Sequence, residues 1–248
     1  MRIFAATVSL AALATLSACG DAPEEDSTDL EVATTESEEA AMDAAREAGD
    51  FLDLQLGAKI VGPQGPEVEG ALSNAEGNFA DIRSYVACPA GMDPCNPKTA
   101  PEGTVYTFVH TVFPGEDNQD DSGSGQANNS SDIERATAFR MTAPAHGFTG
   151  SAGYAKASVL AAIGDKATVV VTCVDGALVW TVDAGEGGNQ WEQAEPVTFY
   201  WQSTLPPAGP SDKYAIEANY TTATGPGPYP AATDGVSNAC LPEADESA

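Results

Sequence analysis

The segment Glu116–Gly125, with the sequence EDNQDDSGSG, carries the oxygen-bearing side chains that a hard cation requires. Calcium takes about six to eight oxygen ligands, and Asp117, Gln119 and Asp121 are spaced like the first ligands of an EF-hand loop. The pattern then departs from that loop, because Ser122 stands where its glycine is expected and the bidentate glutamate is missing. We interpret the segment as a solvated loop and keep calcium binding as an alternative.

Trp191 lies among glutamates in the segment 183–196, DAGEGGNQWEQAEP. A loop of this kind could present an aromatic ring for stacking on a sugar, together with the pair of carboxylates that glycoside hydrolysis needs. Acidic proteins place glutamates in loops routinely, so the simpler interpretation is a solvated loop without catalysis. Trp191 stays a candidate ligand-binding residue.

The two histidines and the serine at 151 do not form a recognisable catalytic set. His110 is expected to share a strand face with Tyr106 and Phe108 and to pack there, while His146 lies in a Pro- and Gly-containing loop with no carboxylate at ligand spacing. The sequence around Ser151, GSAG, lacks the G-x-S-x-G arrangement of a nucleophile elbow. We therefore expect no enzymatic activity, and an envelope-polymer hydrolase is the alternative if a histidine meets carboxylates in the fold.

Cys19 stands where an apolar opening gives way to an acidic tract. Arg2 and the fourteen-residue apolar run 3–16 have the form of a signal peptide, and the run is shorter than the roughly 20 residues that span a bilayer. The sequence LSAC that ends at Cys19 resembles the lipobox of bacterial lipoprotein precursors. No family resemblance is found for the remainder of the chain.

The resemblance implies a diacylglycerol thioether on Cys19, cleavage after Ala18 and acylation of the new amino group. Two or more acyl chains anchor a protein stably in a lipid bilayer, whereas one chain binds only marginally. In this family an aspartate directly after the cysteine can signal inner-membrane retention; Gly20 occupies that position, which favours the outer membrane of the bacterial cell envelope, with the protein facing the periplasm or the cell surface. Ordinary signal peptidase cleavage after Gly20 is the alternative and would release the protein.

Five cysteines are an odd number for an oxidising compartment, and lipidation of Cys19 would leave four. Of the three connectivities we favour one short loop, Cys88 with Cys95, and one long connection, Cys173 with Cys240. A zinc site would need closer pairs such as C-x2-C, which the sequence lacks, so no metal site is expected at these thiols.

The net charge of −27 and a pI near 4.1 exclude nucleic acid as a natural partner, because both would carry the same sign. Residues 21–50 hold twelve acidic residues and one basic residue, with no aromatic residue. Such a tract cannot bury enough apolar surface to fold, so residues 19–50 are predicted to be a disordered, lipidated linker after a signal peptide at 1–18.

Period-two alternation from Phe51 onward predicts an all-β domain at 51–240, followed by an acidic tail at 241–248. Asp175-Gly176 predicts a tight hairpin turn, and AKASVLAAIG predicts one short helix ending at Gly164. Short strands with Gly- and Pro-rich spacers favour an antiparallel β-sandwich with Greek-key links. The strands are expected at 51–56, 82–87, 104–113, 136–142, 168–174, 177–182, 197–202 and 214–220.

These features predict a non-catalytic interaction module of the cell envelope, with a protein or glycan as its partner. A calcium- or carbohydrate-binding module is the second hypothesis. Both hypotheses place the ligand contacts on the loops, because the side chains of the strands are expected to form the core.

Overall fold

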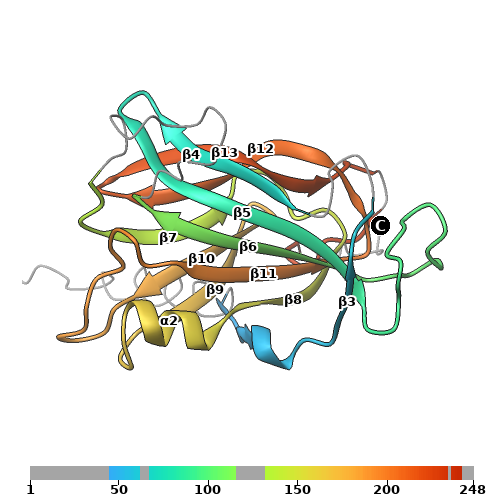
Figure 1. Cartoon of the computed structure of the whole chain (residues 1–248), viewed down its shortest axis with the longest axis horizontal. Coiled ribbons are helices and arrows are strands. Elements are labelled where there is room, and N and C mark those ends of the chain that lie inside the picture. Colours follow the sequence, from blue (N-terminus) through green and yellow to red (C-terminus); the bar gives the residue numbers. More distant parts are fainter. Residues whose placement is uncertain (1–44, 62–66, 116–131, 234–235, 242–248) are drawn as a thin grey trace, which may run out of the picture. The chain divides into compact units, whose positions relative to one another are not determined.

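The alternating segments form β-strands, and antiparallel pairing dominates the structure (Figure 1). This computed structural model describes residues 45–61, 67–115, 132–233 and 236–241, which all belong to one unit, Glu39–Ala248. The described residues contain one α-helix, α2 (Lys156–Ala162), and one 3-10 helix, η1 (Phe51–Asp53). The strands are β1 (Ala45–Arg46), β2 (Gly49–Asp50), β3 (Leu56–Lys59), β4 (Val68–Asn74), β5 (Gly77–Pro89), β6 (Tyr106–Pro114), β7 (Ala136–Met141), β8 (Phe148–Tyr154), β9 (Thr168–Val174), β10 (Ala177–Asp183), β11 (Val197–Ser203), β12 (Pro207–Ala218) and β13 (Thr221–Pro230).

The strands join in one mixed sheet with the order β1-β9-β10-β7-β12-β13-β4-β5-β6-β11-β8-β2, and β3 pairs with β5. All named pairs are antiparallel except β2 with β8. The predicted all-β class with one short helix is confirmed. The finer prediction of a two-sheet sandwich with Greek-key links is not specifically confirmed, because the described strands follow one continuous path.

The sheet curls so that its two halves face each other (Figure 1). Aromatic side chains are prominent in the core that they enclose. Phe139 on β7 stacks on Phe199 of β11, with ring centroids 5.1 Å apart, although these strands lie far apart in the sheet order. The indole nitrogen of Trp180 on β10 donates a 3.0 Å hydrogen bond to the carbonyl of Gly153 on β8. The core is therefore formed by contacts between strands that are not neighbours in the sheet.

Strand β6 places alternate residues on the inner face of the curl, although Thr107 and Val109 between them are also buried. Tyr106, Phe108, His110 and Val112 are buried on its inner face, as the spacing predicted. The register pairs His110 with Phe199 of β11, so the two inner faces form one continuous layer. Cross-strand packing of this kind stabilises a sheet beyond its backbone hydrogen bonds.

The folded part begins upstream of Phe51, the boundary that the sequence suggested. Strand β1 pairs with β9 and β2 pairs with β8, so residues 45–50 belong to the sheet rather than to the linker. The expected strand at 51–56 is also wrong in its first half, where the carboxylate of Asp50 accepts a 3.2 Å hydrogen bond from the Leu52 amide and η1 forms. Leu52 is 71% exposed, so the alternation of leucines there does not reflect burial.

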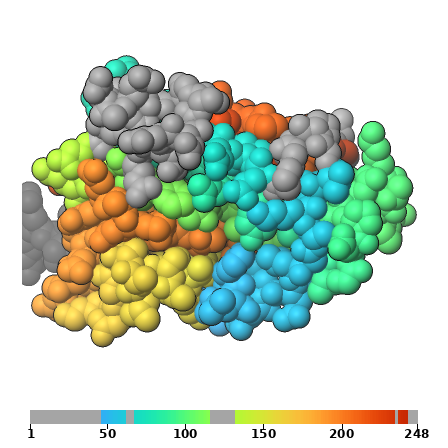
Figure 2. All heavy atoms as spheres, viewed as in Figure 1, coloured from blue at the N-terminus to red at the C-terminus, as the bar shows by residue number. Residues whose placement is uncertain are grey.

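Two local predictions are confirmed. Asp175 and Gly176 have φ values of 50° and 79° and connect β9 to β10 as a two-residue turn, since Ala177 pairs with Val174. Helix α2 is followed by Gly164 at a φ of 111°, whose amide donates to the Val159 carbonyl. Figure 2 shows the N-terminal segment in blue beside the yellow region of α2, where the Lys156 amide donates to Asp50.

Strand β13 lies in a segment, TTATGPGPYP, whose second half was expected to be a spacer. It pairs along its length with β12, but with β4 only at Thr224 and Ser73. The residues after Thr224 include Pro226, Pro228 and Pro230, which have no N–H to donate to a second neighbour. Prolines on one side of the strand therefore limit its pairing with β4 while its pairing with β12 continues.

Candidate functional site

The four downstream cysteines form two disulfides with the pairing that the sequence favoured. Cys88–Cys95 has a Cα–Cα distance of 5.5 Å, and Cys173–Cys240 has one of 5.3 Å. The first closes the loop after β5, and the second attaches the segment after β13 to β9. Both bonds are compatible with an extracytoplasmic location.

The histidines lie apart and neither meets a carboxylate among the described residues. His110 is buried, its Nδ1 is 2.9 Å from the Ser84 hydroxyl, and its ring lies 4.3 Å from that of Tyr214. Burial lowers the pKa of His110 to about 3, so the ring is neutral at physiological pH. His146 contacts the Tyr229 ring in a separate shallow cavity whose lining residues include no carboxylate. The histidine–carboxylate geometry that hydrolysis would need is not found in this part of the chain.

Trp191 does not present its ring to solvent, which corrects the sequence interpretation. Its side chain is 1% exposed, packs against Phe199 at a centroid distance of 5.7 Å, and donates its indole N–H to the Glu195 carbonyl. Its own carbonyl accepts a 2.7 Å hydrogen bond from the Ala136 amide. Trp191 thus anchors a loop to β7 instead of stacking on a ligand.

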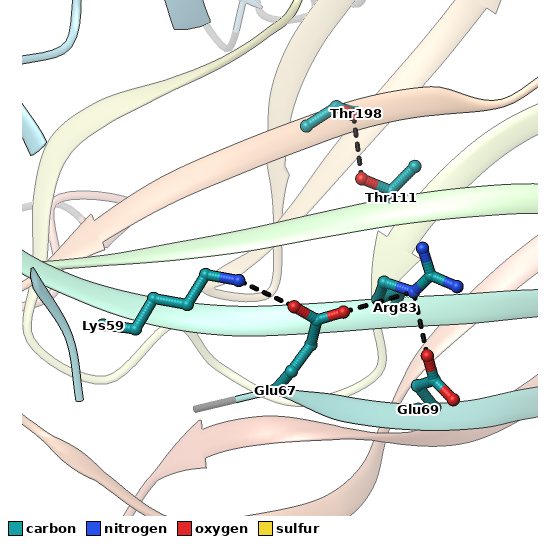
Figure 3. Close-up of polar contacts among 6 residues, drawn as sticks. All are labelled: Lys59, Glu67, Glu69, Arg83, Thr111 and Thr198. Atoms are coloured by element: carbon teal, nitrogen blue, oxygen red, sulfur yellow. Dashed lines mark hydrogen bonds and ion pairs between the residues drawn. The ribbon is translucent and has the colours of Figure 1, made fainter. Parts of the chain in front are cut away.

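The outer face of β4, β5, β6 and β11 carries charged and hydroxyl side chains that bind one another (Figure 3). Glu67 pairs with both Lys59 at 2.7 Å and Arg83 at 3.2 Å, and Arg83 also contacts Glu69 at 3.0 Å. These side chains are partly exposed, and each such pair contributes at most about 1 kcal/mol. Each of these charged side chains already has a partner of opposite charge, so this surface is a poor candidate for a ligand site.

A cavity lies where β12 turns into β13, beside the start of β7. We call it the hairpin-end pocket. Its volume is about 770 Å³, within the range of small-molecule sites. It is lined by Asp132, Glu134, Arg135, Thr137, Gln190, Glu217, Ala218, Asn219, Tyr220, Thr221 and Thr222.

Asn219 fixes one wall of the hairpin-end pocket. Its side-chain oxygen accepts hydrogen bonds from the amides of Glu134 and Arg135, and its amide group donates to the Asp132 carbonyl at 2.7 Å. The backbone amide of Asn219 also donates to the Arg135 carbonyl. The segment 132–135 is therefore held rigidly against the hairpin, while its charged side chains stay free to face the pocket.

The pocket includes three charged side chains that have no ion-pair partner among the described residues. None of the ion pairs among the described residues includes Asp132, Glu134 or Arg135, whereas Glu217 is paired with Arg140 at 2.9 Å. Gln190 reaches the pocket from the loop that Trp191 anchors. Carboxylates, a guanidinium and an amide thus converge from three parts of the chain.

Tyr220 completes the rim with an aromatic ring. It is 101% exposed and has a φ of 65°, next to Asn219 at 48°. These torsions form a type I′ turn, in which glycine is the usual second residue and a bulky side chain is an outlier. The alternation of residues 214–220 predicted a strand that ends at Tyr220, so this site was not expected. The local signal for the turn is the pair Asn219-Tyr220 between two β-rich segments.

Several candidate residues lie outside the described residues: Cys19, Asp117, Gln119 and Asp121. Within the described ranges no cluster of three or more metal-ligating side chains occurs, and no helix there has the length and apolarity to cross a membrane. No protein-family model matches the chain, and no curated protein or solved structure matches it either.

Proposed function

We propose that this protein is a non-catalytic interaction module of the bacterial cell envelope, lipid-anchored through Cys19, that binds a partner at the hairpin-end pocket. The observation that carries the proposal is Tyr220. A ring that is fully exposed adds nothing to the core, and its left-handed backbone costs about 1 kcal/mol relative to glycine. Strain of this kind is found at binding sites, where contacts with a partner offset it.

The chemistry of the pocket fits a glycan. The ring of Tyr220 offers an apolar face of the type on which sugars stack, and the carboxylates of Asp132 and Glu134 accept hydrogen bonds from hydroxyl groups. Arg135 and Gln190 donate hydrogen bonds to ring and acetamido oxygens. Because Asn219 holds one wall in place, little conformational entropy is lost on binding.

The test uses the full chain and glycan strands of bacterial cell wall, freed of peptide, as the probe. We expect saturable binding by calorimetry. Tyr220→Gly should weaken that binding at least tenfold, because the stacking surface is lost, and should raise the free energy of unfolding by about 1 kcal/mol, because glycine accepts the torsions.

Leu160→Ala is the matched control, since it removes an exposed apolar side chain from α2, which contributes nothing to the pocket. It should leave glycan binding unchanged. If the wild-type chain binds no glycan and a photo-crosslinker at position 220 captures a protein, the partner is a protein. If neither probe engages the pocket, the proposal fails.

A further inference from the structure

The path of the sheet has two ends, β9 and β8, and each end is extended by a two-residue strand from the same short segment. Strand β1 pairs with β9 through Ala45 and Arg46, and β2 pairs with β8 through Gly49 and Asp50. Residues 45–50 therefore connect the two edges of the curled sheet. We call the junction of β8 with β9 and β10 the seam.

The segment Asn238–Leu241 crosses the seam a second time. The Ala239 amide donates a 3.1 Å hydrogen bond to the Phe148 carbonyl on β8, and the Asn238 side chain donates a 2.8 Å hydrogen bond to Gly176 in the β9–β10 turn. Cys240 is then joined to Cys173 of β9. Besides this disulfide, a few hydrogen bonds and the packing of Ala239 and Cys240 against the core hold the segment in place.

Arg46 lies where the two crossings meet. Its Nε is 3.3 Å from the sulfur of Cys173, and its terminal nitrogen donates to the Ala239 carbonyl. The guanidinium also lies 5.6 Å from the ring centroid of Phe148. One cation therefore contacts β8, the C-terminal segment and one specific sulfur of the disulfide.

The two disulfides differ in access. Cys88 and Cys95 are both completely buried, whereas Cys173 and Cys240 are partly exposed. Thiol–disulfide exchange requires a thiolate to reach a sulfur atom, so an external thiol meets the seam disulfide first.

We propose that Cys173–Cys240 is a thiol-exchange site for a dithiol protein of the oxidoreductase class, and that Arg46 directs the attack to Cys240. The basis is that the Arg46 Nε is within hydrogen-bond distance of the Cys173 sulfur, whereas no such hydrogen bond to the Cys240 sulfur occurs among the described residues. A nearby arginine stabilises a thiolate, and a thiol with a lower pKa leaves faster.

The reaction proceeds in two balanced steps. A thiolate of the dithiol attacks the Cys240 sulfur, which forms a mixed disulfide and releases Cys173 as a thiolate next to Arg46. The second thiol of the reductant, as its thiolate, then displaces Cys240. The reductant is oxidised to its disulfide, and its two electrons and two protons end on Cys173 and Cys240.

Reduction would leave Asn238–Leu241 attached only by noncovalent contacts, which are a few hydrogen bonds and the packing of Ala239, and would loosen the contact between Arg46 and β8. The seam would then be held by the short β1 and β2 pairings and by the Trp180 hydrogen bond to Gly153. We expect faster amide exchange in β8 after selective reduction, with β5 and β6 unchanged.

The test treats the full chain in detergent with glutathione, a monothiol that stalls at the mixed disulfide, and maps each cysteine by peptide mass spectrometry. We expect the glutathione adduct on Cys240, formed about tenfold or more faster than any adduct on Cys88 or Cys95. Arg46→Gln should slow the reaction several-fold and distribute the adduct over both Cys173 and Cys240.

Arg140→Gln is the control, because it makes the same charge change on β7, where Arg140 pairs with Glu217 and donates to the Met141 carbonyl without contacting either disulfide. It should behave as wild type. If Arg46→Gln does not fold, Arg46→Lys, which keeps the cation, should retain the adduct on Cys240. An adduct mainly on Cys173 in the wild type, equal rates for the two disulfides, or an unchanged adduct distribution in Arg46→Gln would overturn the proposal.

Discussion

His110 is the residue that couples the core to pH. It is enclosed by the rings of Phe139 and Tyr214, and the Ser84 hydroxyl is the hydrogen-bond partner of its Nδ1. Its Nε2 has no hydrogen-bond partner in the described part of the chain. A proton on this ring would place a charge in an apolar interior without a counterion, which is why burial lowers its pKa.

We expect the protein to lose stability as the pH falls below about 6.5. The pKa of His110 is about 3 in the folded chain against 6.5 for an ordinary histidine, so between these values only the unfolded chain binds the proton. The contribution of neutral His110 to the free energy of unfolding is therefore fully present above pH 6.5. It declines by up to about 1.4 kcal/mol per pH unit toward pH 3. Urea denaturation at pH 7 and at pH 5 measures the difference.

The double variant Ser84→Ala/His110→Phe should remove most of this decline between pH 6.5 and 5, where carboxylates are still ionised. His146→Phe is the matched control, because His146 is partly exposed and should leave the decline intact. An unchanged pH slope in the double variant would assign the effect to other groups.

At the scale of elements, the seam depends on two glycines that face each other. Gly49 and Gly153 are register partners in the parallel pair of β2 and β8. A Cβ at Gly153 would overlap the backbone oxygen of Gly49, and one at Gly49 would overlap the Tyr200 hydroxyl. Only glycine allows the N-terminal segment to approach β8 this closely.

Gly153→Ala should therefore displace β2 and weaken the seam, with a loss of about 1–3 kcal/mol in the free energy of unfolding. Hydrogen exchange should accelerate at residues 45–50 and in β8. Gly209→Ala on β12 is the control, since a Cβ there meets no atom within 4 Å. Equal behaviour of the two variants would show that the close approach is not needed.

Strands with strong alternation were predictable, and those with glycine or proline were not. Strands β9, β10 and β11 match their predicted ranges within a residue because β-branched and aromatic residues dominate them. Strands β8 and β13 contain glycines or prolines, which are typical of loops and disfavour a strand prediction. They form strands because neighbouring strands pair with them. Long-range pairing of this kind leaves no local signal.

The candidate site was harder to predict than the fold. Trp191 stands in a polar loop, which suggested exposure, but packing against Phe199 of the next strand and pairing with Ala136 of β7 bury it. Tyr220 follows a β-rich run, which suggested a strand, but the backbone reverses there. The exposure of Trp191 is decided by its packing against folded strands, and that of Tyr220 by a tight turn, whereas the disulfides could be predicted from the number and spacing of the cysteines.

At the scale of the whole molecule, the net charge of −27 bears on how the protein could be held at a membrane. Anionic headgroups repel such a chain, so electrostatic attraction cannot account for membrane association. The resemblance of LSAC at Cys19 to a lipobox offers a different mechanism, in which buried acyl chains contribute about 0.8 kcal/mol per methylene group. Added salt weakens electrostatic attraction to a membrane, whereas it does not weaken anchoring by acyl chains.

We expect Cys19→Ser to move the protein from the membrane fraction to the soluble fraction, because the thioether that carries the diacylglycerol can no longer form. Wild-type protein should stay with the membrane in high salt, since screening does not weaken hydrophobic anchoring. Ser17→Ala, which keeps a small residue in the motif, should behave as wild type. Membrane association of Cys19→Ser that persists after a high-salt wash would exclude lipidation at Cys19 as the anchor, while leaving glycan binding at the hairpin-end pocket to be judged by Tyr220→Gly alone.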